Sequence, residues 1–211
     1  NQTVAAERNF DMFCTALQPL LASHQDTLRQ LDEIRCGFAK VMQEQMEKMW
    51  TAKLGLGTFH TALFMELETL MVQTPVDYTL FFRELSMVPD DIGPLKNSFY
   101  NNSSHTMASI HPTYETAPEE MDKRWSEWLN KWKLLIASKS NTNAAPSCSL
   151  EELSKQMKLV NPKYSLREWL LAPAYQQAVA GDYSLIRELQ EVITQPYAEQ
   201  SKDVEEKYYR L

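Results

Sequence analysis

Residues 161–192, NPKYSLREWLLAPAYQQAVAGDYSLIRELQEV, constrain the fold of this chain more than any other stretch. Pro162 disfavours helical geometry at Asn161, so the segment opens on a turn. Apolar residues then recur at three- and four-residue steps, the period of an amphipathic helix. Gly181 can adopt the left-handed backbone that ends a helix, and Asp182 can cap the helix that follows. Together these signals predict a helical hairpin.

The scarcity of glycine extends this prediction to the whole chain. Only five of the 211 residues are glycine, and glycine is the residue, after proline, that most weakens a helix interior. Leucine, methionine, glutamine and glutamate, which favour helix, are abundant. We therefore predict an all-α fold, a layered bundle of six to nine helices that ends in the hairpin and contains no sheet.

Apolar residues at helical spacing mark the other helices. They predict helices over residues 26–53, 77–85 and 119–138, and a first helix that begins near Val4. Thr58 is the predicted N-cap of a helix that Pro75 ends. The helix over 119–138 carries a tryptophan stripe at three- and four-residue spacing, Trp125, Trp128 and Trp132, which favours core packing over stacking on a base or sugar.

Two segments read as connectors within a single helical region that spans residues 1–211. Residues 89–117 hold three prolines and a polar run, which predicts a mobile connector. Residues 138–148 are rich in Ser, Asn, Thr and Ala, which predicts a flexible linker. Ser149 and Glu152 then form a capping box that starts the next helix.

Charge and cysteine content argue against several classes of protein. The net charge is −7 and no basic run exceeds two residues, so we expect no binding to nucleic acid. No apolar run approaches the roughly 20 residues that a membrane span requires, so we expect no membrane partner. Three cysteines without a Cys-x-x-Cys pair argue against a disulfide scaffold and against a zinc site.

Several segments resemble the selenoprotein O family, and they occur in that family's order. The resemblance covers nearly the whole chain, although only residues 161–197 are specific by themselves. The matching elements are Asn1-Gln2 with Leu17-Gln18-Pro19-Leu20, Lys53-Leu54-Gly55-Leu56, Asp77-Tyr78-Thr79-x-x-Phe82-Arg83, the tryptophan-rich helix, and the stretch that begins at Asn161-Pro162. Two departures are Phe10-Asp11-Met12 in place of Trp-Asn-Leu, and Glu168-Trp169 where Asn is common after the arginine.

The resemblance implies a specific function for the parent family. Its members use a pseudokinase fold to bind ATP with Mg²⁺ or Mn²⁺, and they transfer AMP to Ser, Thr or Tyr of proteins. Their catalytic, nucleotide-binding and metal-binding residues lie upstream of the matched region. This chain would then be the C-terminal helical part, with no such residues and no cofactor of its own. Its partners would be the catalytic lobe and the protein substrates, in the bacterial cytoplasm or in mitochondria.

The resemblance also singles out a set of residues with structural or lobe-contacting roles. An arginine among apolar residues needs a partner when it is buried, so Arg83 and Arg167 are predicted to form buried ion pairs or to contact the catalytic lobe; a direct contact with the nucleotide is the less favoured alternative. The full set is Asp77, Phe82, Arg83, Asn161, Pro162, Arg167, Gly181 and Asp182.

Other motifs with possible chemistry favour simpler interpretations. Gly55-Leu56-Gly57 lacks the third glycine of a dinucleotide-binding loop and is typical of a helix end. Asp91-Ile92-Gly93 imitates the kinase Asp-Phe-Gly, but no catalytic loop precedes it. The four histidines are scattered. The alternatives to the family interpretation are a stand-alone helical protein-interaction module and a small enzyme that works through histidine or cysteine.

Overall fold

The all-α prediction is confirmed. The computed structural model describes residues 2–100, 117–140 and 149–209, and these residues form ten helices and no strand. One isolated antiparallel bridge, between Val76 and Phe99, is the only β pairing within this part of the chain. The count exceeds the predicted six to nine because short helices form near residues 93 and 202. None of the described helices is long and apolar enough to cross a membrane.

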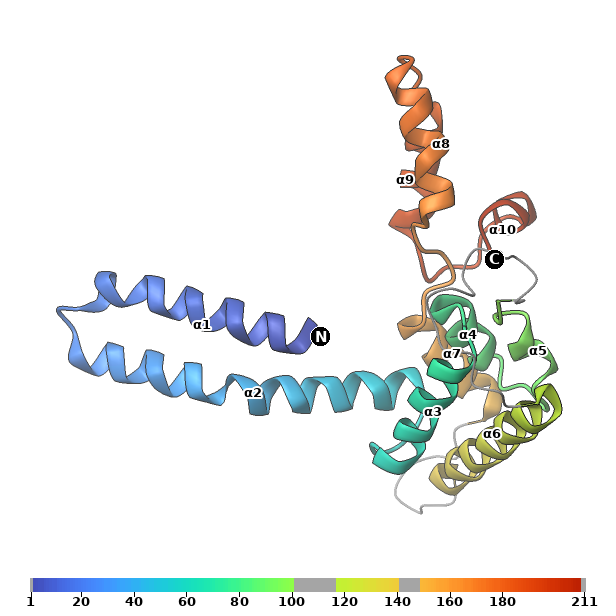
Figure 1. The fold of residues 1–211 in the computed structure, drawn as a ribbon, viewed down its shortest axis with the longest axis horizontal. Coiled ribbons are helices and arrows are strands. Elements are labelled where there is room, and N and C mark those ends of the chain that lie inside the picture. The colour runs from blue at the N-terminus through green and yellow to red at the C-terminus, as the bar shows by residue number, and fades with distance from the viewer. Residues whose placement is uncertain (1, 101–116, 141–148, 210–211) are drawn as a thin grey trace. The chain divides into compact units, whose positions relative to one another are not determined.

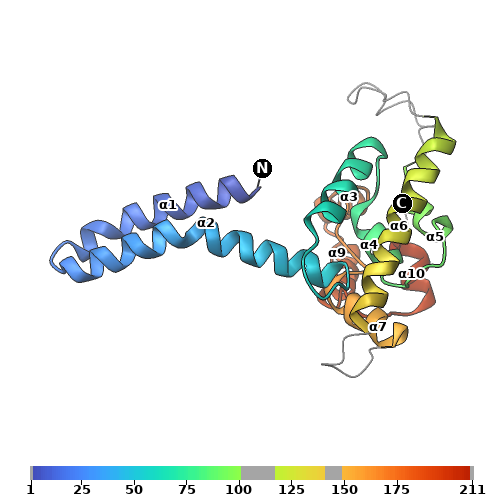
Figure 2. The ribbon, with the colours of Figure 1, turned by 90° about the horizontal axis from the view of Figure 1, so that it is seen from below.

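The chain divides into two compact units, Asn1–Trp50 and Thr51–Leu211. The first unit is a hairpin of α1 (Gln2–Leu21) and α2 (Gln25–Lys53), which lie side by side and antiparallel in both ribbon views (Figures 1 and 2). The rings of Phe10 and Phe38 stack between the two helices with centroids 4.6 Å apart. Helix α2 begins at Gln25, one residue before the start predicted for it, so Asp26 lies in its first turn.

The second unit begins with the last residues of α2 and a turn that requires glycine. Gly55 has φ +65°, in the left-handed region, and its amide donates to the Ala52 carbonyl. A Cβ at this position would lie 2.7 Å from Met157 Sδ and 2.9 Å from Leu153 Cδ1. The glycine therefore ends α2, as the sequence predicted, and it also lets α7 (Leu150–Val160) approach the turn closely.

We expect Gly55→Ala to destabilise the protein more than Gly181→Ala does. Both glycines have positive φ, but a Cβ at Gly181 would meet nothing within 4 Å. Gly181→Ala should therefore cost only the backbone strain of about 1–2 kcal/mol, and Gly55→Ala about 1–3 kcal/mol more for overpacking. Urea unfolding of both variants measures the difference, and equal losses would contradict the close approach of α7.

The main core of the second unit forms around the predicted tryptophan stripe on α6 (Pro118–Ser140). Trp125, Trp128 and Trp132 are fully buried. Each indole N–H donates to a neighbouring element: to Thr74 Oγ1 at 3.0 Å, to the Leu63 carbonyl at 3.0 Å and to the Leu54 carbonyl at 2.7 Å, respectively. The stripe thus holds α3 (Thr61–Gln73), which packs against α6, and the end of α2.

One prediction in this region is wrong in detail. The N-cap of α3 is His60 and not Thr58, and the His60 side chain makes no capping hydrogen bond. The connector predicted over residues 89–117 contains α5 (Gly93–Lys96), with Leu95 fully buried, within its described part. The rest of that connector, residues 101–116, lies outside the described residues, as do residues 141–148 of the predicted linker; α6 itself continues to Ser140.

The C-terminal helices follow the predicted signals closely. Ser149 Oγ accepts the Glu152 amide at 3.2 Å and starts α7. Helices α8 (Glu168–Val179) and α9 (Ser184–Thr194) pack as the predicted hairpin, and α10 (Lys202–Tyr208) follows (Figure 1). Asp182 Oδ1 accepts the Ser184 amide at 2.9 Å, although the boundary residue of α9 is Tyr183. A small second core forms around Tyr164, Ala174, Leu189, Val192 and Tyr208.

Candidate functional site

Most of the family-like residues meet where α4 (Tyr78–Leu85) faces the segments around Asn161 and Glu199, a region that we call the signature junction. Asn161 is fully buried. Its side-chain amide donates to the Lys53 carbonyl and to Ser86 Oγ, both at 2.9 Å, and Ser86 in turn donates to the Phe82 carbonyl at 2.7 Å. The asparagine therefore joins the ends of α2, α4 and α7 through one side chain.

Arg83 is the central cation of the signature junction and is only 1% exposed. Its Nη1 donates to the carbonyls of Lys158 and Asn161 at 3.1 and 3.0 Å, and its Nη2 donates to Glu199 Oε1 at 2.6 Å. The planar fork of an arginine suits this task because its donors point in fixed directions. The structure shows an ion pair of Arg83 within the chain, which is one of the roles that the sequence left open for it.

Glu199 connects Arg83 to a second buried cation. Lys163, which is 4% exposed, donates to Glu199 Oε2 at 2.5 Å and lies 3.0 Å from Glu205 Oε2. Partial burial acts to raise the pKa of Glu199, but hydrogen bonds from Lys163 and Arg83, and their charges, outweigh it and lower that pKa. For Lys163, burial acts to lower the pKa, and the hydrogen bonds to Glu199 and Glu205 reverse this and raise it.

The lowered pKa of Glu199 predicts a loss of stability in acid. Its folded pKa lies below the usual 4.5, so its contribution is present above that pH and disappears as the pH falls through the folded value. Glu199→Gln should therefore lower the free energy of unfolding at pH 7 and flatten its decline below pH 4.5. Urea titrations between pH 3 and 7 test this. Glu206→Gln, at an exposed position of α10, is the matched control and should leave the profile unchanged.

Asp77 and Arg167 form a second ion pair of the signature junction. The two Arg167 Nη atoms donate to the two Asp77 carboxylate oxygens, in the bidentate geometry that gives the strongest such pairs. Asp77 also caps α4 by accepting the Leu80 amide at 2.9 Å, and it accepts the Tyr100 hydroxyl at 3.0 Å. One carboxylate thus fixes the start of α4 and the segment that leads into α8.

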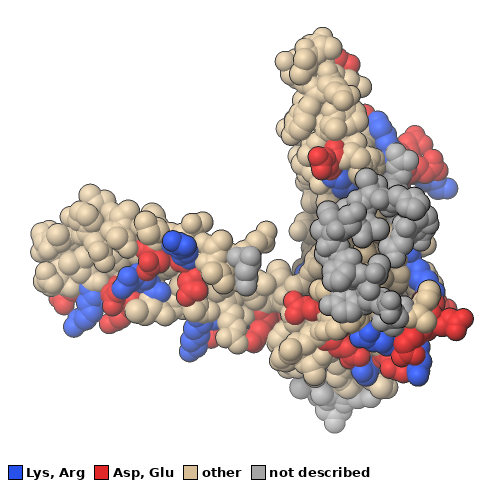
Figure 3. Space-filling model, in the orientation of Figure 1, with Lys and Arg blue, Asp and Glu red and all other residues tan. Residues whose placement is uncertain are grey.

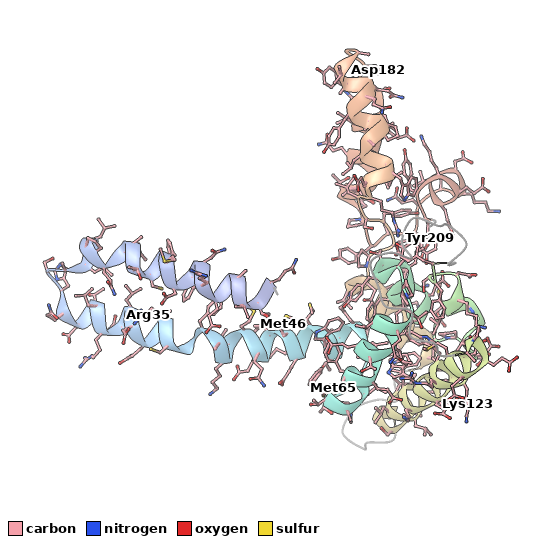
Figure 4. All side chains as sticks on the ribbon, viewed as in Figure 1. Arg35, Met46, Met65, Lys123, Asp182 and Tyr209 are labelled. Carbon is pink, nitrogen blue, oxygen red and sulfur yellow. The ribbon has the colours of Figure 1, made fainter. Side chains whose placement is uncertain are left out.

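The remaining family-like residues, Pro162, Gly181 and Asp182, shape local turns of the backbone and are not part of the signature junction. Pro162 is partly buried and follows Asn161 into the turn. Gly181 has φ +87° and, with Asp182, forms the tip of the α8–α9 hairpin, at the far end from Tyr209 (Figure 4). The structure therefore brings Asp77, Phe82, Arg83, Asn161 and Arg167 into one region and leaves Gly181 and Asp182 outside it.

Sequence reasoning missed three members of the signature junction. They are Lys163 and Glu199, described above, and Tyr209, whose hydroxyl donates to Glu84 Oε1 at 2.6 Å. Burial raises the pKa of the Tyr209 phenol, as does its hydrogen bond to Glu84. Glu199 lies 116 residues from Arg83, and no local periodicity relates positions so far apart. The sequence feature that could have drawn attention to this set is the position of Lys163 directly after Asn161-Pro162.

The motifs that imitate phosphate-binding and metal-binding sites have local structural roles in the described residues. No group of three His, Cys, Asp or Glu side chains within them is arranged to hold a metal. Gly55 turns its Cα towards Met157 and Leu153 and not towards an open phosphate site. The Asp91 carboxylate of the kinase-like Asp-Ile-Gly accepts the Gly93 amide at 2.7 Å, a local turn at the start of α5. The acidic and basic groups of the signature junction neutralise one another.

Comparison with known proteins decides the family. A family model described as protein adenylyltransferase SelO matches residues 1–194. The chain belongs to the SelO family. Similar relatives named protein nucleotidyltransferase YdiU occur in Aromatoleum aromaticum, at 28% identity over 206 residues, and in Photobacterium profundum, at 30% identity over 187 residues. A YdiU protein of Myxococcus xanthus is 30% identical over 184 residues.

These matches cover unequal shares of the two proteins. They include 95%, 87% and 82% of this chain, respectively, but only 35%, 33% and 32% of the relatives. The chain thus spans about a third of the length of the SelO-family relatives that it matches. The hairpin of α1 and α2, the tryptophan core and the signature junction all lie inside the matched residues 1–194, except for Glu199, Glu205 and Tyr209.

Proposed function

We propose that this chain is the helical C-terminal part of a SelO-family protein AMP-transferase, and that it supports the catalytic lobe without taking part in the chemistry. The observation that carries this proposal is the signature junction. Its family-like side chains, Arg83, Asn161, Asp77 and Arg167, are bonded to carbonyls and carboxylates of this chain. Groups bonded in this way hold α4 in place. Those of their atoms that have no hydrogen-bond partner, Arg83 Nε, Asn161 Oδ1 and Arg167 Nε, are buried and so are not open to a substrate.

In the parent reaction, which we propose takes place outside this chain, an acceptor hydroxyl on Ser, Thr or Tyr of a protein attacks the α-phosphorus of ATP. A new P–O bond forms between the acceptor oxygen and the α-phosphorus, the bond from that phosphorus to the oxygen shared with the β-phosphate breaks, and pyrophosphate leaves while the hydroxyl proton passes to a base outside this chain. Mg²⁺ or Mn²⁺, when bound there, would neutralise the phosphate charge. Catalysis of such a transfer requires positioned phosphate ligands and metal ligands. No group of three metal-binding side chains occurs among the residues that the structure describes, which supports a structural contribution of this chain.

A stand-alone interaction module is the second candidate, and the α8–α9 hairpin favours it. No Asp, Glu, Lys or Arg occurs between Glu168 and Asp182, and Figure 3 shows the outer part of this hairpin with few charged side chains. Tyr175 and Val179 of α8 are 61% and 91% exposed. A helix that is apolar on its exposed side is suited to contact with another protein.

A transfer assay distinguishes the candidates. The purified chain is incubated with α-labelled ATP, Mg²⁺ or Mn²⁺ and a mixture of acceptor proteins, beside the intact Aromatoleum aromaticum relative. We expect label on acceptors only with the relative. Transfer by the chain alone would overturn the support proposal. When the chain replaces the matched third of that relative, transfer should be retained. Its loss in a folded chimera would favour the interaction module.

A further inference from the structure

The α1–α2 hairpin has almost no core of its own. Among its described residues, 2–50, Cys14 is the only one that is fully buried. Hydrophobic burial supplies most of the free energy that holds helices together, and a two-helix hairpin buries little. A hairpin of this length therefore requires a covering surface, and its two faces show where that surface binds.

One face of the hairpin is polar. Asp11 and Arg35, one residue after Phe10 and three residues before Phe38, form an ion pair across the two helices at 3.1 Å. Arg35 also pairs with Asp32 at 2.6 Å. Charged side chains run along the visible side of the two helices in Figure 3, and Arg35 lies between the helices in Figure 4. Paired, solvated charges of this kind need no partner.

The opposite face is apolar, and we call its four exposed side chains the hairpin face. At about 100° per residue, Phe13 and Leu20 lie on the side of α1 that faces away from Asp11. Ile34 and Val41 lie on the matching side of α2, away from Arg35. These four side chains are 57%, 76%, 60% and 55% exposed, respectively. In the antiparallel hairpin, Phe13 and Ile34 lie at nearly the same level, each about one helical turn from the Phe10–Phe38 stack towards the turn that joins α1 and α2.

The part of the hairpin face on α1 also lies in an uncharged stretch of the chain. Residues 12–25 contain no Asp, Glu, Lys or Arg. Depletion of charge together with exposed Phe, Leu, Ile and Val is typical of the core of a permanent interface, whereas a transient contact with a passing substrate is more polar. The hairpin face therefore has the composition of a surface that a permanent, equally apolar partner covers.

We propose that the hairpin face is the docking surface for the part of a SelO-family polypeptide that this chain does not span. The relatives match 95% of this chain, the hairpin included, within proteins about three times as long. The unmatched two thirds of such a protein supply the area that a two-helix hairpin lacks. This inference rests on the proposed function, because it identifies the surface through which the support acts.

The test uses the unmatched two thirds of the Aromatoleum aromaticum relative as the partner. In one preparation this partner is added to the 211-residue chain as a separate protein, and in a second preparation it is fused to that chain. The partner should bind the chain in trans. Phe13→Glu with Ile34→Glu should weaken that binding about 100-fold, because two buried anchors are replaced by charges. The milder pair Phe13→Ala with Ile34→Ala should weaken it about 10-fold. Met12→Glu is the matched control, since Met12 is 63% exposed on the outward side of α1, and it should have no effect.

Hydrogen exchange provides the second measurement. Amides of residues 12–21 and 33–42 should exchange at least about 10-fold more slowly in the fusion than in the chain alone, as expected where a contact suppresses local opening. Circular dichroism of each variant establishes that the helices persist. Unchanged exchange, absent binding, or binding that both double variants retain would overturn the docking surface.

A second copy of this chain is the competing occupant. Light scattering tests for a dimer of the chain. A dimer that Phe13→Ala with Ile34→Ala abolishes and that Met12→Glu keeps would assign the hairpin face to self-association, and it would overturn the proposal. The transfer assay separates this result from the proposed function. If the fusion transfers AMP but the hairpin amides exchange as fast as in the chain alone, the docking proposal is refuted and the proposed function is not. If the hairpin amides exchange more slowly in the fusion but the fusion transfers no AMP, the proposed support role is refuted and the docking surface is not.

Discussion

Replacing Arg83 by methionine should destabilise the second unit by about 3 kcal/mol, near the lower limit of the ~3–5 kcal/mol that breaking a buried ion pair costs. The carbonyls of Lys158 and Asn161 would lose their donor inside the protein. The lower limit applies because Glu199 is 52% exposed and can recover water. Urea unfolding at pH 7, followed by circular dichroism, measures the loss.

Two further variants define the cause of that loss. Arg83→Lys keeps the charge near Glu199 but cannot donate to both carbonyls and the carboxylate in one plane, so it should recover only part of the stability. Arg187→Met, at an exposed position of α9, should change stability by less than about 0.5 kcal/mol. If Arg83→Lys were as stable as the original protein, the fork geometry at the signature junction would be unimportant.

The second large effect is expected at Trp132. Its indole is fully buried, lies parallel to that of Trp128 with centroids 6.5 Å apart, and donates to the Leu54 carbonyl. Trp132→Ala should cost about 3–5 kcal/mol, because it leaves a cavity in the core of α6 and an unpaired carbonyl at the end of α2. The midpoint of urea unfolding should fall accordingly.

Trp132→Phe separates packing from hydrogen bonding. Phenylalanine fills much of the same volume but has no N–H, so its cost should be about 1–3 kcal/mol, the range for an unsatisfied buried acceptor. Leu134→Ala on the same helix is the control, since Leu134 is 72% exposed and should change stability by at most about 0.5 kcal/mol. A large loss at Leu134 would show that the exposed side of α6 is covered in solution.

Local signals in the sequence predicted most helix ends and the tryptophan core. Gly55, Gly181 and Ser149 each act through the backbone within a few residues of themselves, so their roles can be inferred without knowledge of the fold. The N-cap at Thr58 was wrong because His60 starts α3 without a side-chain cap. The short helix α5 was missed because proline and glycine, which begin it, also typify loops.

Sequence reasoning identified the arginines of the candidate site but not which carboxylates they pair with. Arg83 and Arg167 were identifiable as cations that need partners, since a charge among apolar residues must be neutralised. Their carboxylates, Glu199 and Asp77, lie 116 and 90 residues away. Asp77 was included for its motif alone, and Glu199 was not included at all.

By itself, the sequence determined the family, the all-α class and the positions of turns, because these depend on residue types and spacings a few residues apart. Only the tertiary structure decided which charges pair at the signature junction and which apolar side chains of the α1–α2 hairpin stay exposed. Both depend on distances between residues far apart in the chain, and those distances are fixed only when the helices pack. The stretch that begins at Asn161-Pro162 shows both levels: its turns follow from sequence, but the partners of Asn161, Lys163 and Arg167 follow from the fold.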